Sequence, residues 1–308
     1  MLSILIGTIL GIIIFFIGMM MITTSMQSLS HNHLKKIIAS LTKNPLLGIL
    51  VGILVTAVLQ SSSTTSVLVV SLVNSRVMNL YQAASVMMGA NIGTTFTGQL
   101  LSFNFFFWIP HILMVGVLLF YLNFSSFTKN IGKFFIGFSF LFMGIQMMVI
   151  FLKPLNNIME FQNLILSIEN QKMKGIFIGA ITTTIIQSSS TGIAILQGLA
   201  ANHSIGIFQA FPIILGQNIG TCSTTLFSSM ITDKNGKRAA MIHLLFNIGG
   251  SILFYPFCHT FSHFIYSITP IDPIKQIANA HTLFNFISLC IFLPFINKMV
   301  DFSKKIIP

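Results

Sequence analysis

One polar string occurs twice in this chain, at a fixed distance, inside sequence that is otherwise strongly hydrophobic. The string Gln-Ser-Ser-Ser-Thr occupies residues 60–64 and returns at 187–191. A second string, Asn-Ile-Gly-Thr, occupies 91–94 and returns at 218–221, so both strings recur after the same 127 positions (60 to 187, and 91 to 218). The two halves therefore align without a gap. Polar interruptions at corresponding places of two hydrophobic halves are typical of proteins with a ligand site between internal repeats.

Charged residues are too scarce for a water-soluble domain. They make up 7% of the 308 residues, whereas hydrophobic residues make up 54%; soluble proteins carry about 25% charged residues. The first acidic or basic residue is Lys35, so the apolar stretch 2–24 lacks the charged start of a signal peptide and is long enough to span a bilayer. We expect an all-α integral membrane protein that crosses the cell (cytoplasmic or inner) membrane several times.

The basic residues and the cysteines point to no further class of ligand. The net charge of +11 comes from lysines and arginines between or beside the hydrophobic segments, which is typical of contact with anionic lipid. Without a basic stripe or an aromatic platform, it does not indicate nucleic acid. Cys222, Cys258 and Cys290 follow no motif and lie in apolar segments, so we expect no disulfide framework, no metal site and no cofactor.

Nine hydrophobic segments are long enough to predict helices. They span about 2–24, 46–74, 79–101, 105–123, 131–152, 175–201, 205–229, 239–266 and 277–297. We expect one membrane transport domain over 1–308. Within it, repeat one is expected at about 1–125, repeat two at about 127–266, and an extra C-terminal helix at about 277–297.

The number of crossings in each repeat decides how the two repeats are oriented. Four complete crossings would leave both repeats in the same orientation. If the Gln-Ser-Ser-Ser segment is a re-entrant hairpin that returns to its own side, three crossings remain and the second repeat is inverted. We prefer this arrangement, which predicts about seven crossings and two re-entrant hairpins. The expected loops 31–44 and 153–174 hold three lysines each, so membrane orientation stays open.

Six consecutive polar residues at 60–65 predict a break in a helix. Non-helical backbone survives in lipid only where protein or water satisfies it. Because serine is a good N-cap, we expect a new half-helix to begin near Ser62–Thr64, with its free amides and positive dipole end facing the break. Such a helix start binds anions. We expect a second break in the next segment, where Gly89 ends one half-helix and Asn91 or Thr94 caps the next.

The predicted breaks hold no charged residue. No Lys or Arg lies within 46–74 or 175–201, so a small oxyanion would have to be held by amides, hydroxyls and co-bound cations. No intramembrane carboxylate is present to relay protons, and we therefore favour sodium as the coupling ion. An alternative is that these polar side chains only form hydrogen bonds between packed helices. That role does not require five identical residues at a fixed offset. A serine nucleophile would need a His–Asp partner and a G-x-S-x-G elbow, which are absent, so we expect no enzyme.

Paired Gln-Ser-Ser-Ser strings, each followed by an Asn-Ile-Gly-Thr string, resemble the type II sodium-dependent phosphate cotransporter family and its bacterial members. The resemblance covers nearly the whole chain. It implies sodium-coupled transport of inorganic phosphate by alternating access, with phosphate and sodium held between the two Gln-Ser-Ser-Ser hairpins. Many bacterial relatives add a PhoU-like C-terminal domain, and this chain resembles a member without it.

The candidate site residues follow from the strings and from this resemblance. The expected phosphate ligands are Gln60, Ser61, Ser62, Ser63, Gln187, Ser188, Ser189 and Ser190. The expected sodium ligands are Gln60, Thr64, Asn91, Thr94, Gln187, Thr191, Asn218 and Thr221. The two halves differ where Thr65 corresponds to Gly192 and Thr95 to Cys222, so they are not expected to bind identically.

Several alternatives stay open at this point. The motif His-x-x-Phe-Asn occurs twice, as the pair His243/Asn247 and again as the pair His281/Asn285. Each pair places a histidine and an asparagine one helical turn apart. We favour a buried pair that packs the repeats together over a role in the transport path or in pH sensing. Beside phosphate, Na⁺ and the lipid bilayer, a homodimer and a separate phosphate-regulatory protein remain open as partners. So do a channel or transporter for another small oxyanion, and a membrane phosphate sensor or regulatory subunit.

Overall fold

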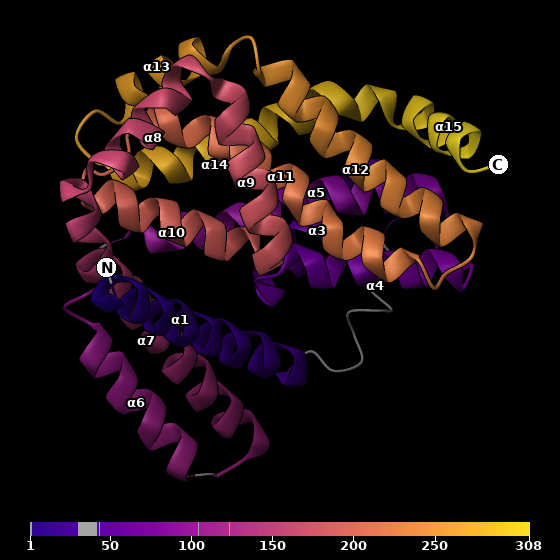
Figure 1. Cartoon of the computed structure of the whole chain (residues 1–308). Coiled ribbons are helices and arrows are strands. Elements are labelled where there is room, and N and C mark those ends of the chain that lie inside the picture. Colours follow the sequence, from indigo (N-terminus) through magenta and orange to yellow (C-terminus); the bar gives the residue numbers. More distant parts are fainter. Residues whose placement is uncertain (1, 30–41, 43, 104, 123) are drawn as a thin grey trace.

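The computed structural model is helical throughout the residues that it describes, which are 2–308 except 30–41, 43, 104 and 123 (Figure 1). None of these described residues lies in a strand, as expected for an all-α chain. The helices are α1 (Leu2–Leu29), α3 (Pro45–Leu59), α4 (Ser62–Asn74), α5 (Leu80–Leu101), α6 (Ile109–Leu122), α7 (Ser126–Leu152), α8 (Met159–Asn170), α9 (Lys172–Ile186), α10 (Ser189–Ala201), α11 (Ile207–Ser229), α12 (Lys234–Phe254), α13 (Cys258–Ile268), α14 (Pro273–Phe292) and α15 (Ile296–Ile306). Short 3₁₀ turns occupy Lys153–Asn157 and Leu293–Phe295.

The helix bounds follow the sequence repeat. Moving α3 and α4 forward by 127 positions gives the bounds of α9 and α10 at every end, and α5 and α11 begin at corresponding residues. In both halves, a helix of 15 residues is followed by one of 13 residues, with the Gln-Ser-Ser-Ser string at the junction. The predicted break in each of these segments is therefore confirmed.

Helices α1, α6 and α7 lie together on one side of the molecule (Figure 1). Contacts between glycines bring α1 and α7 backbone to backbone, because a Cβ at Gly11 would lie 2.9 Å from the carbonyl oxygen of Gly144 and one at Gly18 would lie 2.6 Å from that of Gly137. A later residue of α1 meets an earlier residue of α7, so the two helices run antiparallel. Small residues that admit this approach are characteristic of helix pairs in membranes.

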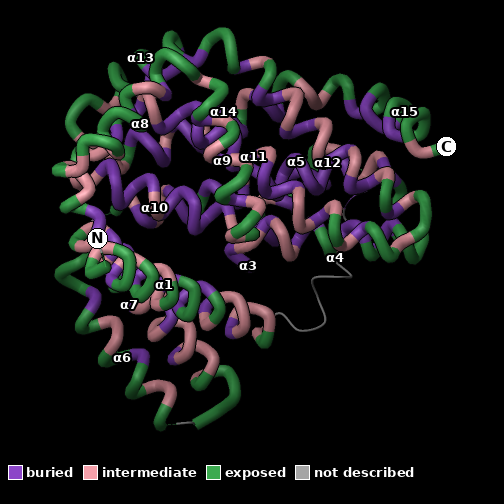
Figure 2. Tube along the Cα trace, viewed as in Figure 1, coloured by how far each residue is buried: buried purple, intermediate pink, exposed green. Residues whose placement is uncertain are grey.

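The other helices pack around a buried centre. Figure 2 shows α5, α10 and α11 buried along most of their length, whereas α6 is mostly exposed. Helix α3 packs along α5, and α9 packs along α11. In each pair the helices run parallel, since Gly48 meets Ser85 and Gly93 meets Ile53 and Thr56.

The predicted break within 79–101, and its counterpart within 205–229, are wrong. Both α5 and α11 are continuous helices through the Asn-Ile-Gly-Thr strings. Gly89 does not end a helix; a Cβ there would overlap the carbonyl oxygen of Ile49 on α3. Gly216 has the same relation to Ile176 on α9. These glycines admit a neighbouring backbone, which is a different use of the same residue type.

Three further expectations need correction. The segment 239–266 is not one helix, because α12 and α13 meet at 83° across Tyr255–Phe257, where Pro256 has no amide hydrogen to continue the helix. The expected loop 153–174 contains the amphipathic helix α8, which buries Ile165 and Ile168. The C-terminal helix begins earlier than expected, at Pro273, and a further helix, α15, follows it. The expected loop 31–44 lies largely outside the described residues.

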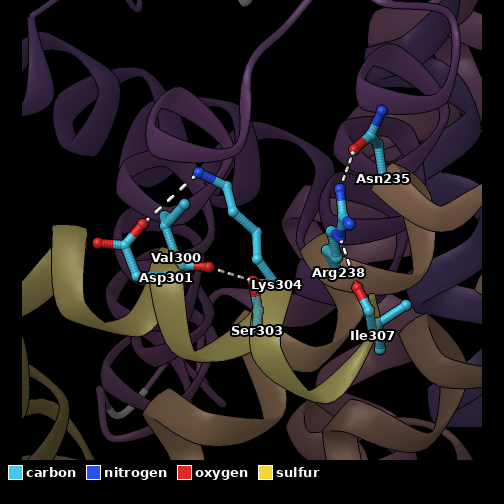
Figure 3. A network of polar contacts seen from close by, with 7 residues as sticks. All are labelled: Asn235, Arg238, Val300, Asp301, Ser303, Lys304 and Ile307. Atoms are coloured by element: carbon cyan, nitrogen blue, oxygen red, sulfur yellow. Dashed lines mark hydrogen bonds and ion pairs between the residues drawn. The ribbon is translucent and has the colours of Figure 1, made fainter.

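Helix α15 is fastened to the start of α12 (Figure 3). The Arg238 side chain donates from Nε to the carbonyl oxygen of Ile307 at 2.9 Å and from Nη1 to Asn235 Oδ1 at 3.0 Å. Within α15, Lys304 pairs with Asp301 at 3.5 Å on the exposed face. Such an exposed pair contributes little stability, so the Arg238 contacts and the buried apolar face of α15 hold the helix in place.

Within the described residues, three helices are long and apolar enough to cross a membrane, namely those at Leu2–Leu29, Ser126–Asn157 and Pro273–Ile306. The bent pair of α12 and α13 makes a fourth if it is a single span. Helices α5 and α11 are also long, with 22 and 23 residues, but they carry many of the polar residues of the chain. The expectation of about seven crossings stays a prediction.

The glycine contact between α3 and α5 can be tested by adding a single methyl group. We expect Gly89→Ala to lower the free energy of unfolding by about 1–3 kcal/mol, because the new Cβ forces α5 away from the Ile49 carbonyl. Gly198→Ala on α10 is the matched control, since its nearest neighbour lies at an ordinary 3.6 Å. Heating the detergent-solubilised protein and following the folded fraction by size-exclusion chromatography compares them. Equal midpoints for the two variants would contradict the packing assignment.

Candidate functional site

The two Gln-Ser-Ser-Ser strings fold in the same way. Gln60 ends α3 with φ 53° and ψ 23°, and Gln187 ends α9 with φ 57° and ψ 24°. This left-handed conformation is uncommon for a residue with a side chain. The next residue is an extended serine that caps the following half-helix: Ser61 Oγ accepts from the Thr64 amide at 3.2 Å, and Ser188 Oγ accepts from the Thr191 amide at 3.3 Å. The new half-helices thus begin where the capping chemistry predicts.

The fold brings the two strings to a common pocket of about 240 Å³. This volume is far above the roughly 10–15 Å³ needed by one water molecule. Helix α1 closes a side of the pocket. The lining residues from the first string are Gln60, Ser61, Ser62, Ser63 and Thr64; those from the second are Gln187, Ser188, Ser189 and Ser190; and those from α1 are Phe16, Met19, Met20, Thr23 and Thr24.

The pocket has no formal charge, but the helix N-termini beside it give it a positive electrostatic potential. None of its lining residues is acidic or basic. Ser62 and Ser63 are the first residues of α4, and Ser189 and Ser190 are the first residues of α10, so two helix N-termini border the same space. Each N-terminus carries free amides and about half a positive charge. With the serine hydroxyls, they form a surface of donors suited to a small anion.

The two glutamines that end the first half-helices differ in freedom. Gln60 is buried, and both ends of its amide are engaged: Oε1 accepts from Thr97 Oγ1 at 2.7 Å, and Nε2 donates to the Ala57 carbonyl at 2.6 Å. The Gln187 side chain is exposed. The equivalent of Thr97 is Thr224, which instead donates to the carbonyl oxygen of Thr221 at 3.0 Å. Gln187 therefore has the freer amide for a ligand.

A second pocket of about 510 Å³ adjoins the first. Ser61, Ser63, Thr64 and Gln187 line both spaces, so these four side chains form the boundary between them. The remaining wall of the second pocket is made by Val67, Thr224 and Phe227. A small ligand in either pocket would contact this same boundary.

The other expected sodium ligands do not line these pockets. Thr191 is buried and bonds to Ser188 Oγ. On α5 and α11, the side chains bond largely within their own helices: Thr94 to the carbonyl oxygen of Ala90, Asn218 to that of Ile214 and Thr221 to that of Gln217. Asn91 is part of a separate buried cluster. Only Gln60, Thr64 and Gln187 among the eight candidates reach the pocket of the paired strings.

The buried cluster around Asn91 links the two halves of the chain. Asn91 Nδ2 donates to Asn247 Oδ1 at 2.7 Å, and Asn91 Oδ1 lies 3.3 Å from His243 Nε2. His243 Nδ1 lies 3.1 Å from Thr225 Oγ1. The favoured interpretation of the first His/Asn pair, a buried contact between repeats, agrees with this geometry. The second pair is less well satisfied, because His281 Nδ1 and Asn285 Oδ1 are buried without a hydrogen-bond partner.

Residues of α1, α11 and the paired strings share the site, and the α1 residues were not expected from the sequence. Thr23 donates to the carbonyl oxygen of Leu59 at 3.0 Å, which ties α1 to the end of α3. Within a segment that is apolar almost throughout, only the polar pair Thr23–Thr24 could have signalled this role. Thr224 and Phe227 carried no signal that separated them from other residues of α11.

Comparison with known proteins relates nearly the whole chain to one family. The family described as Na+/Pi-cotransporter matches residues 14–149 and 156–293. The uncharacterized protein YqeW of Bacillus subtilis (strain 168) is 30% identical over 97% of this chain and 97% of its own length. No solved structure matches the chain.

Two further relatives have names that mention phosphate. YjbB of Escherichia coli (strain K12), named as a candidate inorganic phosphate export protein, is 26% identical over 87% of this chain and 49% of its own length. The chain thus corresponds to about half of YjbB. The human sodium-dependent phosphate transport protein 2B is 45% identical over 64 residues, which are 21% of this chain and 9% of that protein.

The Asn91–Asn247 bond can be weighed against its less satisfied counterpart. We expect Asn247→Ala to destabilise the protein by about 0.6–2 kcal/mol more than Asn285→Ala, because it alone leaves the buried Asn91 amide without its acceptor. Both asparagines also donate to the carbonyl oxygen of the histidine one turn earlier, so that loss is common to both variants. Thermal unfolding in detergent measures the difference. Equal destabilisation would show that the interhelical bond contributes nothing.

Proposed function

The chain belongs to the Na+/Pi-cotransporter family, and from that premise we propose that it carries inorganic phosphate, coupled to sodium, across the cell membrane by alternating access. The observation that supports this most strongly is the pocket shared by the two Gln-Ser-Ser-Ser strings, where the N-termini of α4 and α10 meet. A transporter built from two repeats needs one site to which both contribute.

Phosphate is proposed to bind to the donors at the two helix starts. Ser62, Ser63, Ser189 and Ser190 offer hydroxyls from the first turns of α4 and α10, and the amides of these turns add further donors. Ser61 and Ser188 would orient those turns as caps. Gln187 is proposed to contact the ligand directly because its amide is free. Gln60 is proposed to shape the wall, since its amide is already bonded.

Sodium is proposed to neutralise the bound anion as well as to drive its movement. The pocket contains no basic side chain that could balance phosphate. Co-bound cations would supply that balance, and carbonyl, amide and hydroxyl oxygens suit Na⁺. Of the eight sequence candidates, Gln60, Thr64 and Gln187 line the pocket, and we propose these three as the ones nearest to a cation bound beside phosphate.

The helix directions support an inverted pair of repeats with re-entrant hairpins. Helices α1 and α7 occupy equivalent positions in the two repeats and run antiparallel, as inversion requires. Because α3 and α5 run parallel, the chain must return along α4 between them. At 1.5 Å per residue, the 15 residues of α3 extend about 22 Å, less than the roughly 30 Å of a bilayer core. The pair α3–α4 and its equivalent α9–α10 are therefore each proposed to enter the membrane and return to the same side.

Transport by the purified protein in proteoliposomes tests this proposal. An inward sodium gradient is expected to drive uptake of radiolabelled phosphate. Ser62→Ala and Ser189→Ala are each expected to reduce uptake about tenfold or more, because a hydrogen bond to a charged ligand contributes about 1.5–3 kcal/mol. Ser71→Ala is the matched control, since Ser71 lies on the same helix as Ser62 but is exposed and does not line the pocket.

The alternatives give different results in the same vesicles. Unchanged uptake in both variants would contradict the site assignment. A channel would flux without saturation and would show no counterflow exchange, and a sensor would bind phosphate without moving it. Imposing the sodium gradient in the opposite direction shows whether the protein also supports export, the process in the name of YjbB.

A further inference from the structure

The two halves satisfy their buried polar groups differently behind the helix breaks. In the first half Thr56 and Thr65 are engaged, although the Oγ atom of the next residue, Ser66, is buried without a partner. Thr56 Oγ1 donates to Thr65 Oγ1 at 2.9 Å, and Thr65 Oγ1 in turn donates to the carbonyl oxygen of Ser61 at 3.2 Å. The carbonyl oxygen of Leu59, at the end of α3, accepts from Thr23 of α1 at 3.0 Å.

Three substitutions remove this arrangement from the second half. Gly192 stands at the position of Thr65, so the counterpart of Thr56, which is Thr183, has no hydroxyl to bond to. Ile150 stands at the position of Thr23 and has no hydroxyl to donate to the end of α9. Gln217 stands at the position of Ala90 and introduces an amide that the first half lacks.

The result is a pair of buried oxygens without partners. Thr183 Oγ1 and Gln217 Oε1 each lack a hydrogen-bond partner in the described structure, although the two residues are only 0% and 3% exposed. An unpaired buried polar atom costs about 1–3 kcal/mol, and native proteins rarely leave one without a reason. Both side chains lie on the packed pair of helices α9 and α11.

The Gln217 side chain approaches Gly192 from α11. A Cβ at Gly192 would lie 2.8 Å from Gln217 Nε2 and 3.3 Å from its Oε1, so the missing side chain of Gly192 is what admits the amide. Thr183 lies against Gly220, one turn beyond Gln217 on α11. Gln217, Gly192 and Ile186 also share a pocket of about 180 Å³ between α8, α9, α10 and α11, whose remaining walls are almost entirely apolar.

The chemistry of these groups selects the ligand. The set consists of a hydroxyl, an amide oxygen and the last-turn carbonyls of α9, which lack donors within the helix. No acidic or basic residue lies in 175–201, so neither an anion-binding cation nor a proton-carrying carboxylate is present there. Neutral oxygens that surround the carbonyl end of a half-helix are suited to a small hard cation.

We propose that the second half alone holds a sodium site behind its helix break, formed by Thr183 Oγ1, Gln217 Oε1 and the C-terminal carbonyls of α9. The site rests on the proposed function, for which it names one of the coupling-ion positions. The first half has no equivalent, because Thr56 and Thr65 satisfy each other and Ala90 offers no oxygen. The sodium stoichiometry would then be unequal between the two repeats.

The first half provides the design of the decisive variant. The double substitution Gly192→Thr with Gln217→Ala gives the second half the residues of the first, so Thr183 gains the partner that Thr56 has. This variant is expected to fold as well as the wild type, because it removes two unpaired oxygens. Thr183→Val is a second variant, and Thr56→Val is its matched control in the first half.

Sodium binding is measured directly, in detergent and without phosphate. Binding of radioactive ²²Na⁺ is titrated against choline, and the thermal midpoint is followed over the same range of NaCl with KCl as the control. The double variant and Thr183→Val are expected to weaken sodium binding at this site about tenfold or more, and the sodium concentration for half-maximal phosphate uptake is expected to rise accordingly. Thr56→Val is expected to leave sodium binding unchanged.

Other outcomes would overturn the site without touching the proposed function. If the double variant folds and binds as many sodium ions as the wild type with the same affinity, a water or nothing at all occupies the position. If Thr56→Val and Thr183→Val weaken sodium binding equally, the site is not confined to the second half. Absence of phosphate transport by the wild type would instead contradict the proposed function, whatever the ²²Na⁺ titration gives.

Discussion

A helix that breaks among apolar surroundings must have the free amides and carbonyls at the break satisfied by protein or ligand, and the arrangement of this chain depends on that constraint. Each unpaired backbone group costs several kcal/mol in hydrocarbon. At 60–61 and 187–188 the chain meets the requirement with the same two residue types, a left-handed glutamine and a capping serine. The first residues of α4 and α10, whose other amides the serine does not cap, line the shared pocket. The site is thus formed by backbone groups that the break leaves without a partner within the helix.

Close helix contacts hold these breaks in register. Glycines at 52 and 89 in the first half, and at 179 and 216 in the second, let α3 and α9 lie directly against the backbones of α5 and α11. The helix that carries each Gln-Ser-Ser-Ser string is therefore supported along its length by a continuous partner. These contacts, and not groups inside the pocket, hold the half-helices in place. The pocket can therefore stay open.

The sequence predicted what depends on local chemistry. The half-helix starts, their serine caps and the correspondence of the two halves follow from residues that are neighbours along the chain. The role of Gly89 was misjudged because a glycine can end a helix or admit another backbone, and only the position of Ile49 on α3 decides between these uses. The sequence also could not show the difference between Gln60 and Gln187, because α5 and α11 both carry a threonine at the equivalent position. Thr97 reaches Gln60, whereas Thr224 bonds within its own helix.

That difference between the glutamines has a consequence for the resting protein. In a molecule of two identical inverted halves, a two-fold axis in the membrane plane would relate the states open to either side, and these states would have equal free energy. Here one glutamine is fixed by two hydrogen bonds while the other is free, and the threonine pair behind the first break has no counterpart behind the second. Under the proposed alternating-access mechanism, the two end states would then make different bonds and would have different populations even without ions or a membrane potential. The proposed transporter would owe its conformational preference, when it is empty, to the differences between its two repeats.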